Sequence, residues 1–232
     1  MNLFYLDEDE EQCAKAHCNK HVPKMVVETA QLLCNVHHRM EEPLESIPYK
    51  YTRSAGPSLA PMRWLMTSLD NYRWACRMGL HLSEEYTNRF GGKTHKTQAV
   101  LEWLKVNEPR GLQDIGITTP LCAMPEEYKI ENDPIASYRQ YYVYDKHRFA
   151  AWPEGMTPRW FSKGVEELKR KGLYNNVEIA YPTKNQKQRI VAKRVKRRNL
   201  NTEEKPRGVL KRGAEAVRTT PTRASGKRIK PL

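Results

Sequence analysis

The stretch PMRWLMTSLDNYRWAC, residues 61–76, carries the clearest helical pattern in the chain. Its apolar side chains recur three or four residues apart, at Met62, Leu65, Met66, Leu69, Tyr72 and Cys76. This spacing places them on one face of an amphipathic helix that opens at Pro61, because proline is tolerated in a first helical turn. We expect the helix to bend at Gly79, to continue to Phe90 and to end at the pair Gly91-Gly92.

Helix-start signals occur on both sides of this stretch. Asp7 or Asp9 can cap a helix that runs to about Cys18, and Pro23 opens another that runs to Met40. Further helices are expected at about residues 97–106, 134–150 and 158–171, while the prolines within 41–60 indicate a loop. The sequence therefore predicts an all-α fold, a compact multi-helix body that follows a short N-terminal extended segment.

The chain of 232 residues has a net charge of +13, which is unevenly distributed. Residues 184–232 contain 17 lysines and arginines and three acids, whereas residues 1–183 contain 23 basic and 24 acidic residues. The C-terminal part also lacks Phe, Trp and Tyr, so it has little apolar surface with which to form a core. We expect a helical globular domain over residues 1–183 and a disordered basic tail over residues 184–232.

The densest basic cluster of this tail consists of Lys193, Arg194, Lys196, Arg197 and Arg198. Such runs bind polyanions through counterion release, with little sequence preference and a steep dependence on salt. They also serve as nuclear import signals in hosts that have a nucleus. The tail therefore predicts nucleic acid as a partner.

Composition also bears on membranes and metals. No apolar run approaches the roughly 18 residues that cross a bilayer, and the first six residues lead straight into five acids, unlike a signal peptide. These features favour an intracellular protein without a membrane partner, whose five cysteines are reduced, buried thiols. The alternative is a metal site in the Cys and His cluster of residues 13–38, but the Cys-x-x-Cys spacing of zinc sites is absent there. We therefore predict neither metal ligands nor a cofactor.

Four polar residues share one face of the helix that begins near Pro23: His21, Lys24, Glu28 and Gln31. An imidazole, an ammonium group, a carboxylate and an amide in one row can perform acid–base chemistry and bind phosphate. The alternative is a solvated helix face with a Lys24–Glu28 ion pair worth a few tenths of a kcal/mol, ~0.3.

Two further segments combine groups that bind nucleic acids. Residues 137–148 interleave tyrosines with basic residues, and we expect Tyr138 and Tyr142 to face the core while Arg139 and Tyr141 contact nucleic acid. In residues 89–97, a Gly-Gly turn precedes Lys96 and a helix start, an arrangement that can cradle a phosphate. The alternative reading of these glycines and threonines is a plain helix end followed by a cap.

Several segments resemble a largely uncharacterised family of small proteins from tailed phages and large DNA viruses. They are NLFYLD at 2–7, CNKHVPKM at 18–25, ETAQLL at 28–33, SLDNYRW at 68–74, EYTNRFG at 85–91, AMPEEYK at 123–129 and ASYRQYY at 136–142. The likeness covers roughly residues 1–161. More distantly, the chain resembles pyrimidine-dimer DNA glycosylases of the endonuclease V type, which are compact helical enzymes that end in a similar segment rich in Tyr and Lys.

This second resemblance implies a specific chemistry. In those enzymes the N-terminal α-amine attacks the sugar carbon, and a glutamate on an early helix assists. Carried over, the amine is that of Met1 or Asn2 and the glutamate is Glu28, with Lys24 as a second candidate amine. An α-amine has a pKa of about 7.7–8.0, so part of it is a free nucleophile at neutral pH.

These observations lead to a functional expectation. We expect a viral DNA-transacting protein, a DNA repair N-glycosylase and AP lyase that acts on damaged or modified bases, with DNA rather than RNA as partner. We expect the protein to be located in the host cytoplasm or nucleoid, or in the nucleus of a eukaryotic host. The alternative is a non-catalytic nucleic-acid-binding accessory protein of a virus.

Overall fold

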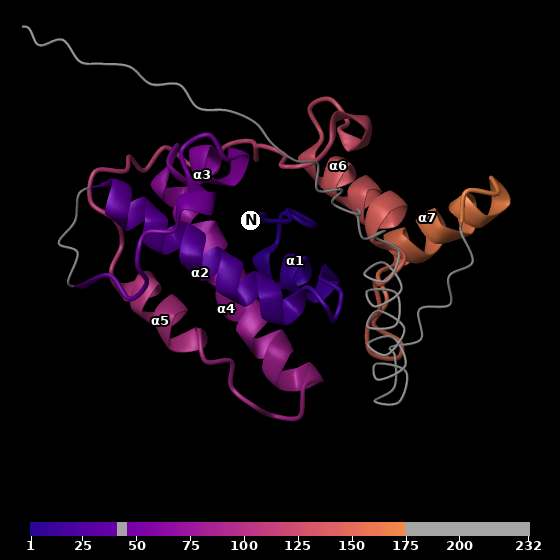
Figure 1. Cartoon of the computed structure of the whole chain (residues 1–232), viewed down its shortest axis with the longest axis horizontal. Helices are drawn as coiled ribbons and strands as arrows, with labels where there is room; N and C mark the ends of the chain where they lie inside the picture. Colours follow the sequence, from indigo (N-terminus) through magenta and orange to yellow (C-terminus); the bar gives the residue numbers. More distant parts are fainter. Residues whose placement is uncertain (41–45, 175–232) are drawn as a thin grey trace, which may run out of the picture. The chain divides into compact units, whose positions relative to one another are not determined.

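A computed structural model describes residues 1–40 and 46–174 of the chain. This part of the chain contains seven α-helices and no β-strand, so the predicted all-α fold is confirmed (Figure 1). The described residues belong to one unit, Met1–Ile179. The predicted boundary at residue 184 and the predicted tail lie outside the described residues.

The first two helices begin at the predicted signals. α1 (Glu10–Ala16) is capped by Asp9, whose side chain accepts a hydrogen bond from the backbone N–H of Gln12 at 2.8 Å. α2 (Val22–Arg39) has Pro23 in its first turn, where a missing backbone N–H costs nothing. Residues 1–7, before α1, form an extended segment that pairs with no strand in the described part.

The predicted single helix over residues 61–90 is wrong at one point. The structure divides it into α3 (Ala60–Leu65) and α4 (Leu69–Arg89), because Ser68 adopts an extended backbone and caps α4. The Ser68 hydroxyl accepts a hydrogen bond from the backbone N–H of Asp70 at 3.1 Å. The predicted bend at Gly79 does not interrupt α4, which runs through that residue.

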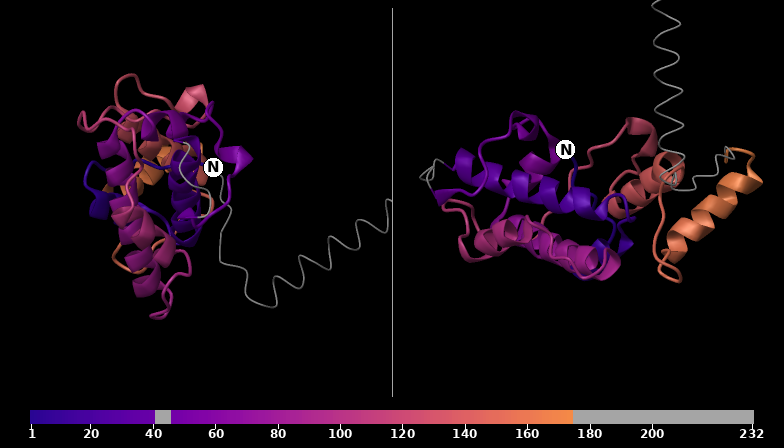
Figure 2. Two further views of the ribbon diagram at one scale, coloured as in Figure 1. Left: turned by 90° about the vertical axis from the view of Figure 1, so that its left-hand side faces the viewer. Right: turned by 60° about the horizontal axis from the view of Figure 1, so that its bottom comes forward.

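The core lies between α2, α4 and α5 (Gln98–Val106), which pack against one another (Figure 2). Gly79 allows this close packing, because a Cβ at that position would lie 3.0 Å from Leu101 of α5 and 3.1 Å from Thr29 of α2. The largest fully buried side chains include Met25 and Leu33 of α2 and Trp74 of α4. Each such side chain contributes about 1.5–3 kcal/mol through removal from water.

The second half of the described chain holds two more helices. α6 (Pro134–Tyr141) continues as a π-helical turn from Tyr142 to Lys146, close to the predicted helix at 134–150. α7 (Arg159–Arg170) ends before Gly172, whose φ of 68° suits glycine, so the predicted end of this helix is confirmed. None of the described helices is both long and apolar enough to cross a membrane.

A long segment, residues 107–133, joins α5 to α6 and is irregular except for a short 3-10 helix, Glu126–Tyr128. Side chains of α3 and α4 hold it in place. Arg73 forms two hydrogen bonds to the carboxylate of Glu108 at 2.7 and 2.8 Å and pairs with Asp114 at 2.7 Å. The indole N–H of Trp64 donates to the carbonyl of Thr118 at 2.9 Å. These contacts carry the chain back toward the N-terminal segment.

Candidate active site

The N-terminal segment is held inside the molecule. Leu3, Phe4, Tyr5 and Leu6 are buried one after another, which is possible only where neighbouring elements cover both sides of an extended chain. The Cys13 thiol donates to the carbonyl of Phe4 and accepts from the N–H of Leu6, both at 3.3 Å. Arg139 donates to the carbonyl of Leu6 at 2.8 Å. The start of the chain therefore has a fixed path.

Both polar atoms of the Asn2 side chain form hydrogen bonds that hold this residue in place. Its Nδ2 donates to the carbonyl of Ala123 at 2.8 Å, and its Oδ1 accepts from the hydroxyl of Tyr138 at 3.2 Å. The same Oδ1 accepts from the backbone N–H of Leu3 at 2.8 Å. Through these bonds, the irregular segment and α6 both determine where the backbone nitrogen of Asn2 lies.

That backbone nitrogen meets the carboxylate of Glu28. The N–H of Asn2 donates to Oε2 of Glu28 at 3.0 Å, and Nζ of Lys24 lies 3.2 Å from Oε1 of the same carboxylate. The Glu28 side chain is 14% exposed, whereas that of Lys24 is 60% exposed. One half-buried carboxylate thus has a nitrogen on each oxygen, an arrangement suited to proton exchange with an amine.

His21, the first residue of the predicted row, lies apart from this carboxylate. Its ring is buried, stacks on Phe4 with 4.8 Å between centroids, and shares a hydrogen bond between Nδ1 and the hydroxyl of Tyr142. Burial lowers the pKa of His21 to about 3, and the nearby His17 and lysines act in the same direction. His21 is therefore neutral at neutral pH and belongs to the core.

The residues expected to contact nucleic acid occupy different places. Arg139 pairs with Asp7 at 2.9 Å and lies over the ring of Trp160. Tyr141 accepts a hydrogen bond from Lys146 at 3.0 Å and packs at a tilt against Tyr128. Lys96 is exposed. The basic cluster of the tail, Lys193, Arg194, Lys196, Arg197 and Arg198, lies outside the described residues.

Tyr138 and Tyr142 are 1% and 0% exposed, so their predicted orientation toward the core is confirmed. The sequence pattern did not indicate that Tyr138 also reaches Asn2. Ala123 was missed altogether, because it acts through its backbone and a backbone carbonyl has no sequence signature. The only available signal was the aromatic character of residues 138–144.

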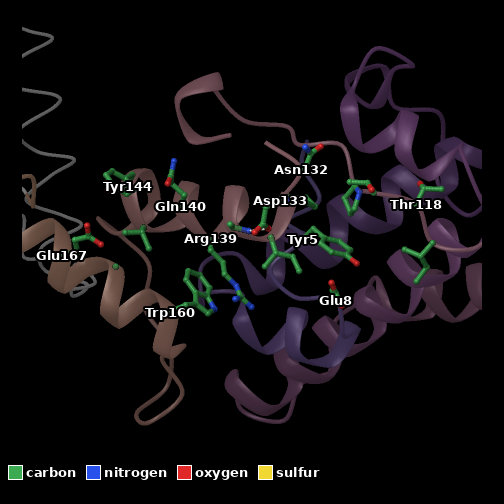
Figure 3. A pocket seen from close by; sticks show the side chains of 18 of the residues that line it. Tyr5, Glu8, Thr118, Asn132, Asp133, Arg139, Gln140, Tyr144, Trp160 and Glu167 are labelled. Atoms are coloured by element: carbon green, nitrogen blue, oxygen red, sulfur yellow. Dashed lines mark hydrogen bonds between the residues drawn. The ribbon is translucent and has the colours of Figure 1, made fainter. Parts of the chain in front are cut away.

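A cavity of about 1130 Å³ lies beside the N-terminal segment and is lined by Tyr5, Arg139 and Trp160, among others (Figure 3). Neither Asn2 nor Glu28 lines it. Its acids, Glu8, Asp133 and Glu167, outnumber its bases, Arg139 and Lys171. This charge is unfavourable for a phosphate backbone, so we place the candidate site at Asn2 and Glu28 instead.

The cysteines do not add a reactive or metal-binding group to this site. All five are free, and burial raises the pKa of Cys13 to about 12 and that of Cys34 to about 11. These two thiols stay protonated at neutral pH and are therefore weak nucleophiles, since nucleophilic attack requires the thiolate. Within residues 1–40 and 46–174, no three His, Cys, Asp or Glu side chains are grouped so that they could hold a metal ion.

Met1 is half-buried and packs against the hydrophobic core, directly before the nitrogen that faces Glu28. With Met1 present this nitrogen is an amide, which is not nucleophilic. Removal of Met1 would turn it into a primary α-amine 3.0 Å from a carboxylate.

Comparison with family models, curated proteins and solved structures gives no match for this chain.

Proposed function

We propose that this protein is a DNA N-glycosylase with an associated lyase activity, whose nucleophile is the α-amine of residue 2 after removal of Met1. The observation that carries the proposal is the hydrogen bond of 3.0 Å between the nitrogen of Asn2 and the carboxylate of Glu28. A carboxylate in this position can accept the proton that an ammonium group must lose before it attacks.

The reaction would proceed through an imine. The amine attacks C1′ of the deoxyribose, the N-glycosidic bond breaks, and the departing base takes up a proton. The C1′–O4′ bond then opens, which leaves an imine between residue 2 and C1′. Loss of a proton from C2′ expels the 3′ phosphate by β-elimination, and water hydrolyses the imine to restore the amine.

Glu28 would have two tasks in this sequence. Its carboxylate takes the proton from the amine before attack, and its negative charge stabilises the positive charge that develops on the sugar as the base departs. The limited exposure of Glu28 strengthens this second effect, because a partly desolvated carboxylate is screened less by water. A damaged base also stacks poorly, which lowers the free energy required to extrude it.

Lys24 is the second amine of the site, since its Nζ also contacts Glu28. Its exposure of 60% leaves it accessible to a DNA strand. An imine can form with either amine, so the proposal must be tested in a way that distinguishes residue 2 from residue 24.

Borohydride trapping provides that test, because it reduces the imine to a stable secondary amine. The full chain is incubated with ultraviolet-irradiated, abasic and undamaged duplexes, and the adduct is mapped by peptide mass spectrometry. An adduct at residue 2, together with the loss of Met1 in the intact mass, supports the proposal. An adduct at Lys24 moves the nucleophile there, and the absence of any adduct overturns the glycosylase function.

Two matched variants test the role of Glu28. Glu28→Gln keeps the shape of the side chain but removes its basicity, and we expect it to abolish the adduct while DNA affinity is retained. Glu102→Gln makes the same change on α5, where the exposed side chain accepts a hydrogen bond from Gln98. Undiminished trapping by Glu28→Gln would exclude Glu28 from the reaction.

A non-catalytic DNA-binding accessory protein is the second candidate function. It is favoured by the charge distribution, because residues 184–232 hold 17 basic residues and three acids. This function predicts that deletion of residues 184–232 abolishes DNA binding, since residues 1–183 are nearly neutral. Strand cleavage by the truncated chain at low salt would contradict it.

A further inference from the structure

Three segments that are distant in the sequence meet at the first turn of α2. The ring of His95, in the loop before α5, lies near the backbone of Pro23 and packs edge-on against Tyr86 of α4. The ring of Phe149, after the π-helical turn, lies 4.4 Å below Nζ of Lys20. In the same region, the N–H of Asn19 donates to the carbonyl of Ala151 at 2.7 Å.

Each of these segments carries an exposed cation at the meeting point. Lys20 belongs to the turn before α2, Lys96 follows His95, and Arg148 precedes Phe149. All three are exposed, and no acidic side chain of the described residues pairs with them. By contrast, Arg73, Arg77 and Arg89 of α4 are each paired with at least one carboxylate.

Few acids oppose these charges. The stretches 17–35, 86–101 and 134–153 contain only two acids, Glu28 and Asp145. Glu28 is paired with Lys24, and Asp145 is paired with Lys146 at 2.6 Å. Burial is the main cause of the lowered pKa of His21, and the charges of His17, Lys24, Lys146 and Lys20 act in the same direction.

We propose that Lys20, Lys96 and Arg148 form a phosphate-binding face that holds the backbone of duplex DNA beside Glu28. Lys20 lies in the turn that leads into α2, and Lys24 and Glu28 follow on the helix itself, one helical turn apart. The choice of DNA as the occupant rests on the proposed function. Arg139 is not part of this face, because it is committed to Asp7 and to the carbonyl of Leu6.

The test compares two triple variants of the full chain that remove the same charge. Lys20→Ala/Lys96→Ala/Arg148→Ala removes the face, and Arg63→Ala/Lys105→Ala/Lys163→Ala removes three exposed cations of α3, α5 and α7. Affinity for an undamaged duplex is measured by fluorescence anisotropy between 50 and 200 mM salt, with a duplex RNA of the same sequence beside it. Three lost phosphate contacts reduce the slope of log affinity against log salt by about 2.7.

We expect this reduction on DNA for the first triple variant and a change below about 0.9, less than one contact, for the second. Equal changes in the two variants, or a change on RNA alone, would overturn the proposal. If the first triple variant does not fold, the three single variants replace it, each with an expected change of about 0.9. Undamaged DNA forms no imine, so this result is independent of borohydride trapping and the two proposals can fail separately.

Discussion

The hydroxyl of Tyr138 donates a hydrogen bond to Oδ1 of Asn2 across 3.2 Å, although 136 positions separate the two residues in the chain. The same hydroxyl accepts a hydrogen bond from the N–H of Ala123 at 3.1 Å, and Nδ2 of Asn2 donates to the carbonyl of Ala123 at 2.8 Å. The three bonds close a ring around the Asn2 side chain. A buried tyrosine of α6 therefore determines where the nitrogen that faces Glu28 lies.

Tyr138→Phe is expected to loosen this ring without disturbing the packing of the aromatic side chain. Asn2 loses one hydrogen bond and the N–H of Ala123 loses its acceptor, so the free energy of unfolding should fall by about 1–2 kcal/mol. Urea unfolding measures this change, and slower borohydride trapping at unchanged DNA affinity would identify Tyr138 as a positioning residue. Tyr144→Phe is the control, because that tyrosine is 36% exposed. Equal effects of the two variants would argue against the ring.

Arg89 offers a test of the packing between α1 and α4. Its side chain is 2% exposed, pairs with Glu85 and donates to the carbonyls of His17 at 2.7 Å and Lys15 at 2.9 Å. Arg89→Met leaves a buried carboxylate without a partner and exposes the unpaired carbonyls at the end of α1, so we expect a loss of about 3–5 kcal/mol in urea unfolding.

The exposed pair of Lys15 and Glu11 serves as the comparison for Arg89. Lys15→Ala should leave the free energy of unfolding nearly unchanged, because exposed ion pairs contribute little to stability. Adding Glu85→Gln to Arg89→Met should restore part of the loss, because a neutral amide is easier to bury than a carboxylate. An equal loss in the free energy of unfolding for Arg89→Met and Lys15→Ala would show that the buried ion pair contributes no more to stability than the exposed one.

Local signals predicted most helices of this fold, and the error at residues 66–68 has a physical cause. Proline and aspartate mark the starts of α1, α2 and α6, because they satisfy or remove the free N–H groups of a first turn. Around Ser68 the apolar spacing continues without interruption. A serine is tolerated within a helix as well as at its cap, so the spacing alone could not locate the break.

The candidate site was harder to predict, since its contacts join distant parts of the chain. Helical spacing predicted Glu28 as a candidate beside Lys24, and Asn2 was expected only from the proposed resemblance to glycosylases. The ring formed with Tyr138 and Ala123 has no local pattern. His21 illustrates a related limit. Helical spacing places His21 on the same side as Lys24, but it cannot show that Phe4 and Tyr142 cover the first turn.

The buried histidines should make folding depend on pH. Burial lowers the pKa of His17 to about 4 and that of His21 to about 3, from 6.5. Between pH 6.5 and about 4 the unfolded chain therefore binds more protons than the folded one, so the stability that is present above pH 6.5 is lost as the pH falls through this range. At pH 5 each histidine should lower the free energy of unfolding by about 2 kcal/mol relative to pH 7.

Urea unfolding at pH 7 and pH 5 measures this loss, and NMR titration of the ring protons assigns it. His17 and His21 should keep the chemical shifts of neutral imidazole down to pH 5. Pairing with Arg73 holds the pKa of Glu108 below 4.5, so this carboxyl group stays ionised at both pH values. His81→Gln is the control, because it removes a histidine whose ring is partly exposed at the surface. Titration of His17 and His21 near pH 6.5 would contradict the prediction.

The contact between α7 and the π-helical turn depends on a glycine. A Cβ at Gly164 would lie 2.6 Å from Cγ2 and 2.9 Å from Cγ1 of Val143, a buried side chain that has no flexible end to move away. Gly164→Ala should therefore lower the free energy of unfolding by about 1–3 kcal/mol through overpacking. Val143→Ala removes the opposing methyl groups, so the double variant should be more stable than the sum of the two single effects by at least about 1 kcal/mol.

Ser162→Ala, on the exposed side of α7, should stay within about 0.5 kcal/mol of the wild type. Additive single effects would mean that Gly164 and Val143 do not touch, and would remove the contact that anchors α7 to the segment carrying Arg148.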